Sequence, residues 1–523
     1  MKSIIYSKTI MFIILTTSLF VLVFFVRSTF SLGNSGLILL YSIFIIYEII
    51  AKIDAPNNYL HVLILLLLLP HLFFNIPFKL KNIRIVLKIA TVLMASICLI
   101  QMLQNYLENQ NRLICATLDN PSGISVFLSL CFPLITNSNN RRFTFEDYFW
   151  MSLVFLVILL IESRSGILSL IIILFLRLIK GNMREQGPFP MALIILFVTF
   201  LFSMFCTKNN STLGRFFIYM ASLSLVFDNL WFGHGYYGFT SEYMQSQASY
   251  FKCHPNSIFS DLADETMHPL NEFISLFISS GIVGVLLITS IVWKVYSMRN
   301  EQYEAYYYCL VAFFVQSLCT YTLRYPFVWF FVILCISQIA QNSTITTKVM
   351  NYKRIFVFLA CIFSYFIVFH DMFYEYNWHK TFTQRPSTLS NYERLSNHWN
   401  GNPFFWYNYA AISYYENRYE QSCQLLKRYI MYVDDYSARL MLANNYYERG
   451  MYDSASINYS NAFYMCPNRF VPLQGLLRSY KKMNYKNEAD SIACQIINKR
   501  PKIDSYMVSV IKAEAHKYLN YGK

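Results

Sequence analysis

Long apolar runs follow one another through the first 371 residues of the chain. Each approaches the roughly 20 residues that a helix needs to cross a bilayer core of ~30 Å. The runs are continuous rather than alternating, which predicts helices and not barrel strands. They fall near 9–26, 36–52, 59–78, 84–103, 121–137, 147–161, 164–180, 190–206, 269–296, 304–322, 324–341 and 354–371. The pattern predicts an all-α, polytopic transmembrane bundle of about 11–12 spans over 1–371. No small-residue cleavage site and soluble domain follow the first run, which argues against a cleaved signal peptide.

From about residue 372 the apolar runs stop, and a pattern of two helices joined by a turn recurs every 34 residues. In its clearest copy, the first helix carries Leu442, Ala443 and Tyr446, and the turn is at Gly450. The second helix carries Ala455, Tyr459 and Ala462, and Pro467 ends it. Later and earlier copies place equivalents at Leu476, Tyr480, Ala489, Ala493 and Pro501, and more weakly at Ala410, Tyr419 and Ser422. The spacing resembles tetratricopeptide repeats (TPRs), and three repeats suffice for a stacked core with a concave surface. We therefore expect 372–523 to form a separate TPR-like domain; a helical cap without partners is the alternative.

The charge distribution gives the bundle an orientation. The chain carries a net charge of +14, yet only 14% of its residues are charged, against about 25% in soluble domains. The basic residues gather on every second connection, at Lys79, Lys81, Arg84, Lys88, Arg141, Arg142, Arg177, Lys180, Arg184, Lys294, Arg299, Lys348, Lys353 and Arg354. This is the positive-inside pattern, so the surplus reflects topology rather than nucleic-acid binding.

The same phase predicts which connections lie outside. They are 104–120, the turn at 162–164, the long segment 207–268, the turn at Arg324, and everything after 371. Twelve spans that end outside would also begin outside, yet Lys2 and Lys8 before the first run look cytoplasmic. This conflict suggests that one of the first three runs does not cross fully. The proline-containing stretch LLLLLPHLFFNIP is the candidate.

The twelve cysteines include no C-x-x-C pair and no metal-ligand spacing. Those in apolar runs are expected to be packing residues. Cys423, Cys466 and Cys494 fall in the C-terminal region, where the sequence leaves their pairing open.

Polar residues interrupt the apolar pattern on the predicted outer side. The turn IESRSGILSL carries Glu162 and Arg164, and Arg215 opens an amphipathic stretch that ends at the turn Gly233-His234-Gly235. Arginine at a membrane boundary often only snorkels to lipid headgroups. The amphipathic stretch equally fits a helix lying on the membrane, and a lone Gly-x-Gly is weak evidence for a phosphate cradle.

The segment 240–268 is polar and irregular, and loops of this length are usually functional. It contains His254 and ends at His268, which precedes Asn271 and Glu272 at the start of an apolar run. Helix starts favour anions, although a single histidine is more often structural.

Four pieces in this order resemble the O-antigen ligase and polymerase-like membrane glycosyltransferases, a family that includes protein O-oligosaccharyltransferases and has members with tetratricopeptide tails. The pieces are LDNPSGISVFLSLCFPL (118–134), ESRSGILSL (162–170), GRFFIYMASLSLVFDNLWFGHGYYGF (214–239) and HPLNEFISLFISSGIVG (268–284). The resemblance implies a GT-C-like bundle in the bacterial inner membrane, with the active site and the C-terminal domain facing the periplasm.

The resemblance also implies a mechanism. The donor is a glycan on undecaprenyl pyrophosphate, and Arg164 and Arg215 are the residues expected to bind its pyrophosphate. A histidine accepts the proton of the acceptor hydroxyl, which attacks the anomeric carbon with inversion, without a metal or cofactor. Glu162, Asn271, Glu272, Gly233 and Gly235 are supporting residues. The acceptor is a lipid A core, a glycan or a protein, and a protein partner at the repeats is a further expectation.

The sequence departs from the family pattern at the histidine. Most members place it directly before the asparagine, where this chain has Leu270, and His268 lies two residues earlier. Since Pro269 can begin a helix, His268 is the expected base and His254 the reserve. A polysaccharide transporter or flippase is the alternative from another class, but transporters place ionisable residues at mid-membrane. A non-catalytic scaffold built on the repeats is a third reading.

Overall fold

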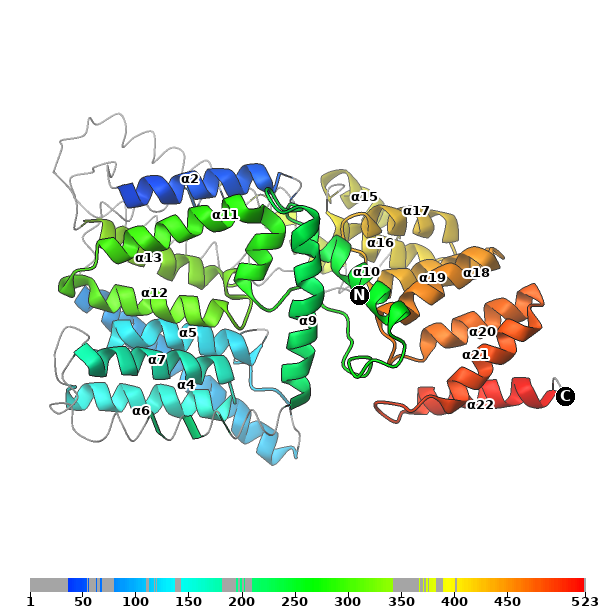
Figure 1. Ribbon diagram of the computed structural model, residues 1–523, viewed down its shortest axis with the longest axis horizontal. Coiled ribbons are helices and arrows are strands. Elements are labelled where there is room, and N and C mark those ends of the chain that lie inside the picture. Colours follow the sequence, from blue (N-terminus) through cyan, green and yellow to red (C-terminus); the bar gives the residue numbers. More distant parts are fainter. Residues whose placement is uncertain are drawn as a thin grey trace.

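The computed structural model describes residues 36–53, 80–109, 112–116, 120–136, 143–180, 209–341, 376–381, 389–399 and 402–521, with isolated positions between them. Every regular element in these residues is a helix, which confirms the all-α prediction. The helices form a bundle on one side and a stack of shorter helices on the other (Figure 1). The predicted runs at 9–26, 59–78, 190–206 and 354–371 lie largely outside the described residues.

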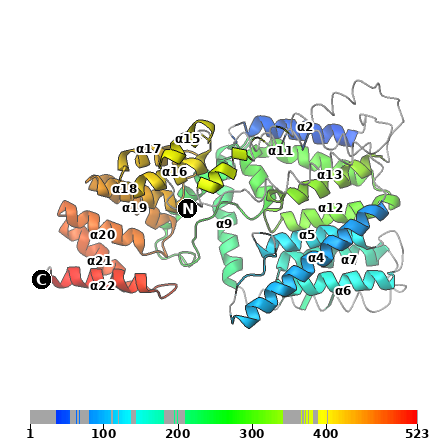
Figure 2. The ribbon, with the colours of Figure 1, turned by 180° about the vertical axis from the view of Figure 1, so that it is seen from behind.

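The bundle helices coincide with predicted apolar runs. They are α2 (Gly36–Ala51), α4 (Leu80–Leu107), α5 (Pro121–Ile135), α6 (Phe145–Leu160), α7 (Arg164–Lys180), α11 (Glu272–Ser297), α12 (Glu304–Ser317) and α13 (Pro326–Gln341). Among the described helices, α4 and α11 are long and apolar enough to cross a membrane, and α2, α5 and α13 are shorter apolar helices. α4 crosses the back of the bundle (Figure 2) and exposes a row of apolar side chains, including Ile85, Val86, Ile89, Leu93, Ile100 and Leu103. Exposed apolar surface of this extent is typical of contact with lipid or protein.

Local sequence explains where two of these helices begin. Asn120 caps α5 by accepting a hydrogen bond from the backbone of Ser122, with Pro121 at the first helical position. Asn271 caps α11 and accepts from the backbone N–H groups of Phe273 and Ile274. Both caps lie at the same end of the bundle, because Asn120 and Asn271 each contact the segment that joins α12 to α13.

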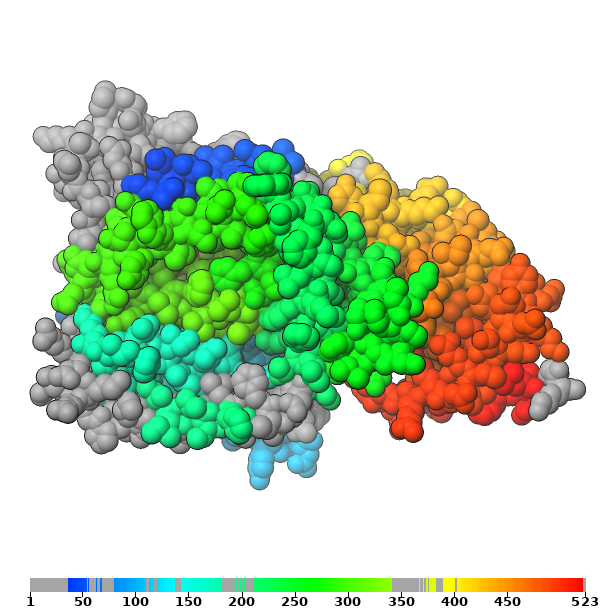
Figure 3. Space-filling model, viewed as in Figure 1, coloured from blue at the N-terminus to red at the C-terminus, as the bar shows by residue number. Residues whose placement is uncertain are grey.

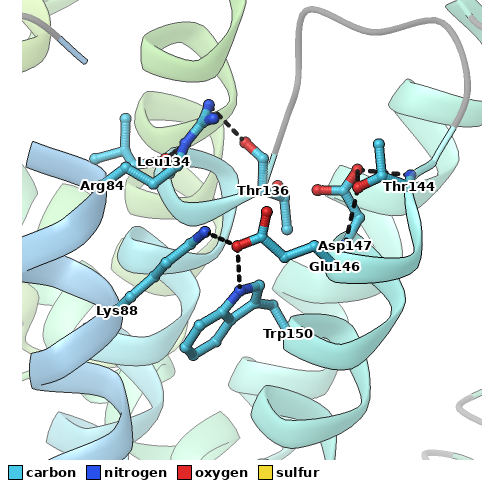
Figure 4. A network of polar contacts seen from close by, with 8 residues as sticks. All are labelled: Arg84, Lys88, Leu134, Thr136, Thr144, Glu146, Asp147 and Trp150. Atoms are coloured by element: carbon cyan, nitrogen blue, oxygen red, sulfur yellow. Dashed lines mark hydrogen bonds and ion pairs between the residues drawn. The ribbon is translucent and has the colours of Figure 1, made fainter. Parts of the chain in front are cut away.

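Two groups of basic residues lie at the opposite end. Arg84 donates to the carbonyl oxygens of Leu134 and Thr136, at 3.2 and 3.3 Å, and ties the start of α4 to the end of α5 (Figure 4). Lys88 pairs with Glu146 of α6, which also accepts from the indole of Trp150.

A second cluster at this basic end joins α7 to α12. Lys180 lies 2.5 Å from the carboxylate of Glu304, which is 2% exposed, and Arg299 lies 3.7 Å from it. α7 runs from Arg164 to Lys180, so Arg164 and these basic clusters lie at opposite ends of the bundle.

Two helices of the segment 207–268 separate the bundle from the stack. α9 (Asn209–Asp228) lies across the end of the bundle in both views, and α10 (Gly238–Cys253) lies between α9 and the stack (Figures 1 and 2). α9 exposes Leu213, Phe216, Met220, Leu223 and Phe227, a stripe with helical spacing. The amphipathic stretch predicted from Arg215 is therefore a helix, and it begins six residues earlier, at Asn209.

The predicted run 269–296 is not one continuous helix. α11 is broken at Gly281, whose φ of 62° is in the left-handed region. The turn 230–235 pairs with the break: His234 N–H donates to the carbonyl of Ile278 at 2.7 Å, and Ile282 N–H donates to the carbonyl of Leu230 at 2.9 Å. Hydrophobicity alone could not reveal the break, because glycine is compatible with an apolar run.

The C-terminal stack consists of α15 (Leu389–Trp399), α16 (Pro403–Tyr415), α17 (Tyr419–Ile430), α18 (Tyr436–Glu448), α19 (Tyr452–Met465), α20 (Val471–Met483), α21 (Lys486–Asn498) and α22 (Tyr506–Tyr521). Helix pairs occur where the 34-residue pattern predicts them. Small residues at the predicted crossings are fully buried, namely Ala410, Ser422, Ala443, Ala455, Ala462, Ala489 and Ala493. A side chain on Gly475 would collide with the ring of Tyr459, so close packing extends from one pair to the next. Cys423, Cys466 and Cys494 are free cysteines.

The stack shares part of its core with the segment 207–268. Tyr243 and Met244 of α10 form one hydrophobic cluster with Tyr436, Ala462 and Met465 of the stack. In the space-filling view this segment fills the region between bundle and stack (Figure 3). Period and composition do not reveal which face of a repeat packs against another segment, so this shared core was not predicted.

Candidate functional site

The connection between α12 and α13, residues 318–325, is contacted by several of the predicted site residues. Arg215 donates from Nη1 to the carbonyl of Cys319 at 2.8 Å. Asn271 donates from Nδ2 to the carbonyl of Leu318 at 3.1 Å. The carboxylate of Glu272 accepts from the backbone N–H of Leu323 at 2.7 Å. This connection therefore brings together residues from α9, from the start of α11 and from the α12–α13 turn.

His268 joins the same connection through its ring. It is half-buried, its Nε2 contacts Nη1 of Arg324, and its ring centroid lies 5.3 Å from that of Tyr321. Tyr321 accepts a hydrogen bond at 3.0 Å from Asn120, the cap of α5. A guanidinium has five donors and no acceptor. Nε2 therefore presents a lone pair to Arg324, which requires the neutral ring with its proton on Nδ1.

Arg164 contacts α9 about one turn before Arg215. As the first residue of α7, it donates to the hydroxyls of Thr212 and Ser211 on α9, at 2.7 and 3.0 Å. The guanidinium groups of Arg164 and Arg215 are close enough to interact electrostatically, and both lie near Cys319. Both side chains are half-buried. Two like charges held together at the rim of the bundle form a surface that attracts anions.

Two residues next to the predicted site have left-handed backbones without being glycine. Glu162 has φ of 50° and Leu270 has φ of 55°, a conformation that is uncommon for residues other than glycine. Leu270 lies between His268 and the cap Asn271, and its carbonyl accepts from the hydroxyl of Tyr219 at 3.3 Å. The unusual conformation reverses the chain between the histidine and the helix start. Glu162 itself is exposed in the turn before Arg164.

His254 and the Gly-x-Gly turn lie elsewhere. His254 is exposed at the end of α10, where its ring stacks on Tyr250 at 4.6 Å and its Nδ1 lies 3.0 Å from the carbonyl of that residue. Gly233 and Gly235 have φ of 75° and 78° and lie against the break in α11. The N–H of Gly235 already donates to the carbonyl of Ser279 at 3.1 Å. The turn therefore closes a broken helix.

Three residues at this site were not predicted as site residues, namely Asn120, Tyr321 and Arg324. The signal for Arg324 was present in the sequence, because an arginine in an outer turn is not required by the charge rule. The same argument had selected Arg164. Asn120 was within the motif quoted for 118–134, but its contact with Tyr321 spans 201 positions of sequence and is visible only in the fold.

Comparison with known proteins points to a family. A search of curated proteins returns no match to the chain. A model of the family described as O-Antigen ligase matches residues 149–289. The matched segment contains Arg164, Arg215, His254 and His268, whereas Asn120 and Arg324 lie outside it. The match supports a relation of this chain to the O-antigen ligase family, whose members are membrane-embedded enzymes of the glycosyltransferase type.

Proposed function

We propose that the protein transfers a glycan from an undecaprenyl-pyrophosphate donor to an acceptor hydroxyl, at the outer face of the bacterial inner membrane. The observation that carries the proposal is that Arg164, Arg215 and His268 lie at one end of the bundle, where Arg164 contacts α9 about one turn before Arg215. The pair of guanidinium groups supplies a site for a pyrophosphate, and the histidine supplies a base.

In the proposed reaction the acceptor oxygen attacks the anomeric carbon from the face opposite the pyrophosphate. The bond from that carbon to the phosphate oxygen breaks, and the configuration inverts. Arg164 and Arg215 stabilise the negative charge that develops on the departing pyrophosphate, for which bidentate guanidinium contacts are well suited. His268 accepts the proton of the hydroxyl as the new bond forms.

Arg324 has two roles in this proposal. Its contact with Nε2 of His268 favours the neutral histidine, which is the form that can accept a proton. It is also a third guanidinium at the same connection as Arg215, within reach of an anion held there. When a pyrophosphate is bound, we expect Arg324 to turn toward it and to leave the lone pair of His268 for the acceptor hydroxyl.

The arrangement of the bundle supports the proposed membrane orientation. Basic clusters occupy one end, and the candidate site occupies the other. The apolar stripe of α9 lies across the site end, where it would rest in the outer leaflet. Because the site is at one end and not at the middle of the bundle, the geometry favours a transferase over a flippase.

A protein acceptor is a second candidate within the same reaction class. The C-terminal stack, which we take to be a periplasmic TPR-like domain, is docked on the segment that leads to His268. An acceptor polypeptide held on the stack would therefore lie close to the base, as in a protein O-oligosaccharyltransferase.

The test uses the full-length protein in liposomes with a short glycan on undecaprenyl pyrophosphate. Acceptors are lipid A core, free glycan or a membrane-protein extract. The wild type is expected to release undecaprenyl pyrophosphate and to yield an inverted linkage. His268→Ala should lower the transfer rate by about 10²–10⁴-fold, as expected for loss of a general base, while donor binding persists.

Arg215→Lys should also transfer glycan slowly, since the point charge of a lysine ammonium does not replace the planar, bidentate guanidinium of arginine. His254→Ala is the matched control, because its ring lies on α10. Loss of transfer in His254→Ala with full activity in His268→Ala would move the base to His254. Full activity in both would refute base catalysis by histidine.

A further inference from the structure

The residues leading into His268 run along the C-terminal stack. Residues 261–268, called here the approach segment, begin after α10 and end at the proposed base. Ala263, 1% exposed, packs with Phe217 of α9 and Phe251 of α10, and Tyr464 of α19 packs against the same cluster. Met267, directly before His268, packs against the hydrophobic core of the stack. The approach segment is therefore held from the side of the stack.

A corner of the stack binds the backbone and one side chain of this segment. Asn468 and Arg469 lie between α19 and α20. The amide of Asn468 donates to the carbonyls of Ala263 and Asp261, at 2.7 and 3.3 Å. Nη2 of Arg469 lies 2.5 Å from the carboxylate of Asp264. These contacts fix the first half of the approach segment.

A further contact fixes the second half. The hydroxyl of Ser437, in α18, donates to the carboxylate of Glu265 at 2.8 Å. The next residue, Thr266, donates from its hydroxyl to the carbonyl of His268 at 3.1 Å. Polar contacts from the stack therefore continue to within three residues of the proposed base, and the apolar contact of Met267 continues to the residue next to it.

The corner is itself rigidly held. The guanidinium carbon of Arg469 lies 4.2 Å from the ring centroid of Tyr436 in α18. Lys499, which follows α21, donates to the carbonyl of Pro467 and, at 3.2 Å, to that of Arg469. Two other parts of the stack thus brace the residues that hold the approach segment.

We propose that Arg469, Asn468 and Ser437 are positioning residues for His268, so that the C-terminal stack completes the active site of the membrane domain. The proposal rests on the proposed function only in taking His268 as the base. It predicts that disturbing the corner slows transfer and leaves donor binding at Arg164 and Arg215 intact. Small displacements of a reacting group cost up to about 10²-fold in rate.

The experiment compares two arginine variants of the full-length protein in detergent micelles and proteoliposomes. Arg469→Ala removes the pair with Asp264, whereas the control Arg478→Ala removes a pair with Glu514, at 2.8 Å, within the stack. Both pairs are partly exposed, and such pairs contribute little to stability, so both variants should fold. Amide hydrogen exchange over 261–268 reports positioning directly, and kcat and donor KM report its consequence.

Arg469→Ala is expected to speed exchange over 261–268 and to lower kcat about tenfold or more, with donor KM changed less than about twofold. Arg469→Lys should recover part of the slow exchange and part of the kcat. Arg478→Ala should change neither the exchange rate over 261–268 nor kcat. Equal effects of Arg469→Ala and Arg478→Ala, or faster exchange with unchanged kcat, would overturn the proposal. If the wild type transfers no glycan, the proposed function fails, while exchange over 261–268 still tests whether the stack holds the segment.

Discussion

At the scale of single residues, the contact between His268 and Arg324 has the most direct chemical meaning. Because arginine cannot accept a hydrogen bond, the contact orients the lone pair of Nε2 toward the guanidinium. A phosphate oxygen is a stronger partner for arginine than a neutral imidazole, since both partners are then charged. In the proposed reaction, binding of the donor would therefore free His268 to act as the base.

The first prediction concerns Arg324. Arg324→Ala should lower kcat/KM for the donor by about 30–1000-fold, corresponding to 2–4 kcal/mol for one lost charge-assisted contact in the transition state. Arg324→Lys should recover little, because lysine lacks the fork. Steady-state transfer in proteoliposomes measures both. Arg112→Ala is the control, since Arg112 pairs with Glu108 in a different connection. Equal losses in Arg324→Ala and Arg112→Ala would contradict a role in the site.

The sequence could predict only part of this site. Arg164, Arg215, His268, Asn271 and Glu272 were selected because polar residues flank apolar runs on one predicted face, and the fold brings all five to the same end of the bundle. Asn120 and Tyr321 were missed because their roles depend on a contact between a helix cap and a turn that lie far apart in the sequence. Such pairings follow from helix packing, which periodicity does not determine.

At the scale of elements, the break in α11 is the feature with the clearest energetic consequence. A β-carbon on Gly281 would lie 2.3 Å from the carbonyl oxygen of Trp231, and the residue has a positive φ. Neither α11 nor the turn 230–235 can accept a side chain there without moving.

The second prediction follows from this close approach. Gly281→Ala should lower the thermal midpoint of the detergent-solubilised protein, because a positive φ costs a non-glycine residue about 1–3 kcal/mol and the clash adds to it. Gly214→Ala is the control. No atom lies within 4 Å of a β-carbon at Gly214, which is inside α9, and alanine there should be neutral or stabilising by up to ~1 kcal/mol. Equal midpoints for the two variants would show that the break tolerates a side chain.

The third prediction concerns Lys499, which braces the corner of the stack. Burial between the rings of Phe463 and Phe470 lowers the pKa of Lys499 to about 8. Between pH 8 and the ordinary lysine pKa of 10.5, Lys499 binds more protons in the unfolded chain than in the folded one. This residue therefore makes the free energy of unfolding rise with pH in that range.

Chemical unfolding of wild type and Lys499→Met, from pH 7.5 to 9.5, measures this effect as the difference between the two proteins. Relative to wild type, the stability of Lys499→Met should fall as pH increases, because only the wild type gains stability from this residue as pH rises. A difference independent of pH would mean that Lys499 is not buried in its charged form.

The elements themselves were largely predictable. Continuous apolar runs located the bundle helices, and the 34-residue pattern located α18 to α21 together with their buried alanines. The orientation of α9 across the bundle was not predictable, because amphipathic periodicity shows that a helix has an apolar and a polar face but not what each face contacts.

At the scale of the whole molecule, two bodies share the segment 207–268. α10 packs on the stack, and α9 packs on α11, with hydrophobic side chains of all of them in one cluster. The C-terminal stack is thus attached to the end of the bundle where the candidate site lies, and both must lie on the same side of any membrane that the bundle spans.

The fourth prediction tests that side. A reporter fused after Lys523 and active only in the periplasm should be active, whereas the same reporter inserted between Asn300 and Glu301, at the basic end of the bundle, should be inactive. The physical reason is the segregation of basic residues at that end. Activity of the internal fusion, or of a cytoplasm-specific reporter at the C-terminus, would contradict the proposed orientation.

The broken helix α11 also bears on how the chain is made. Backbone groups freed at a break need partners, since a bilayer core offers none, and here the turn 230–235 provides them. Synthesis runs from the N-terminus, so this turn leaves the ribosome more than forty residues before the break at Gly281 does. The groups that satisfy the break are therefore synthesised before the break itself. A rearranged gene that encoded the turn after α11 would reverse this order, and the break would lack its partners until the turn had been made.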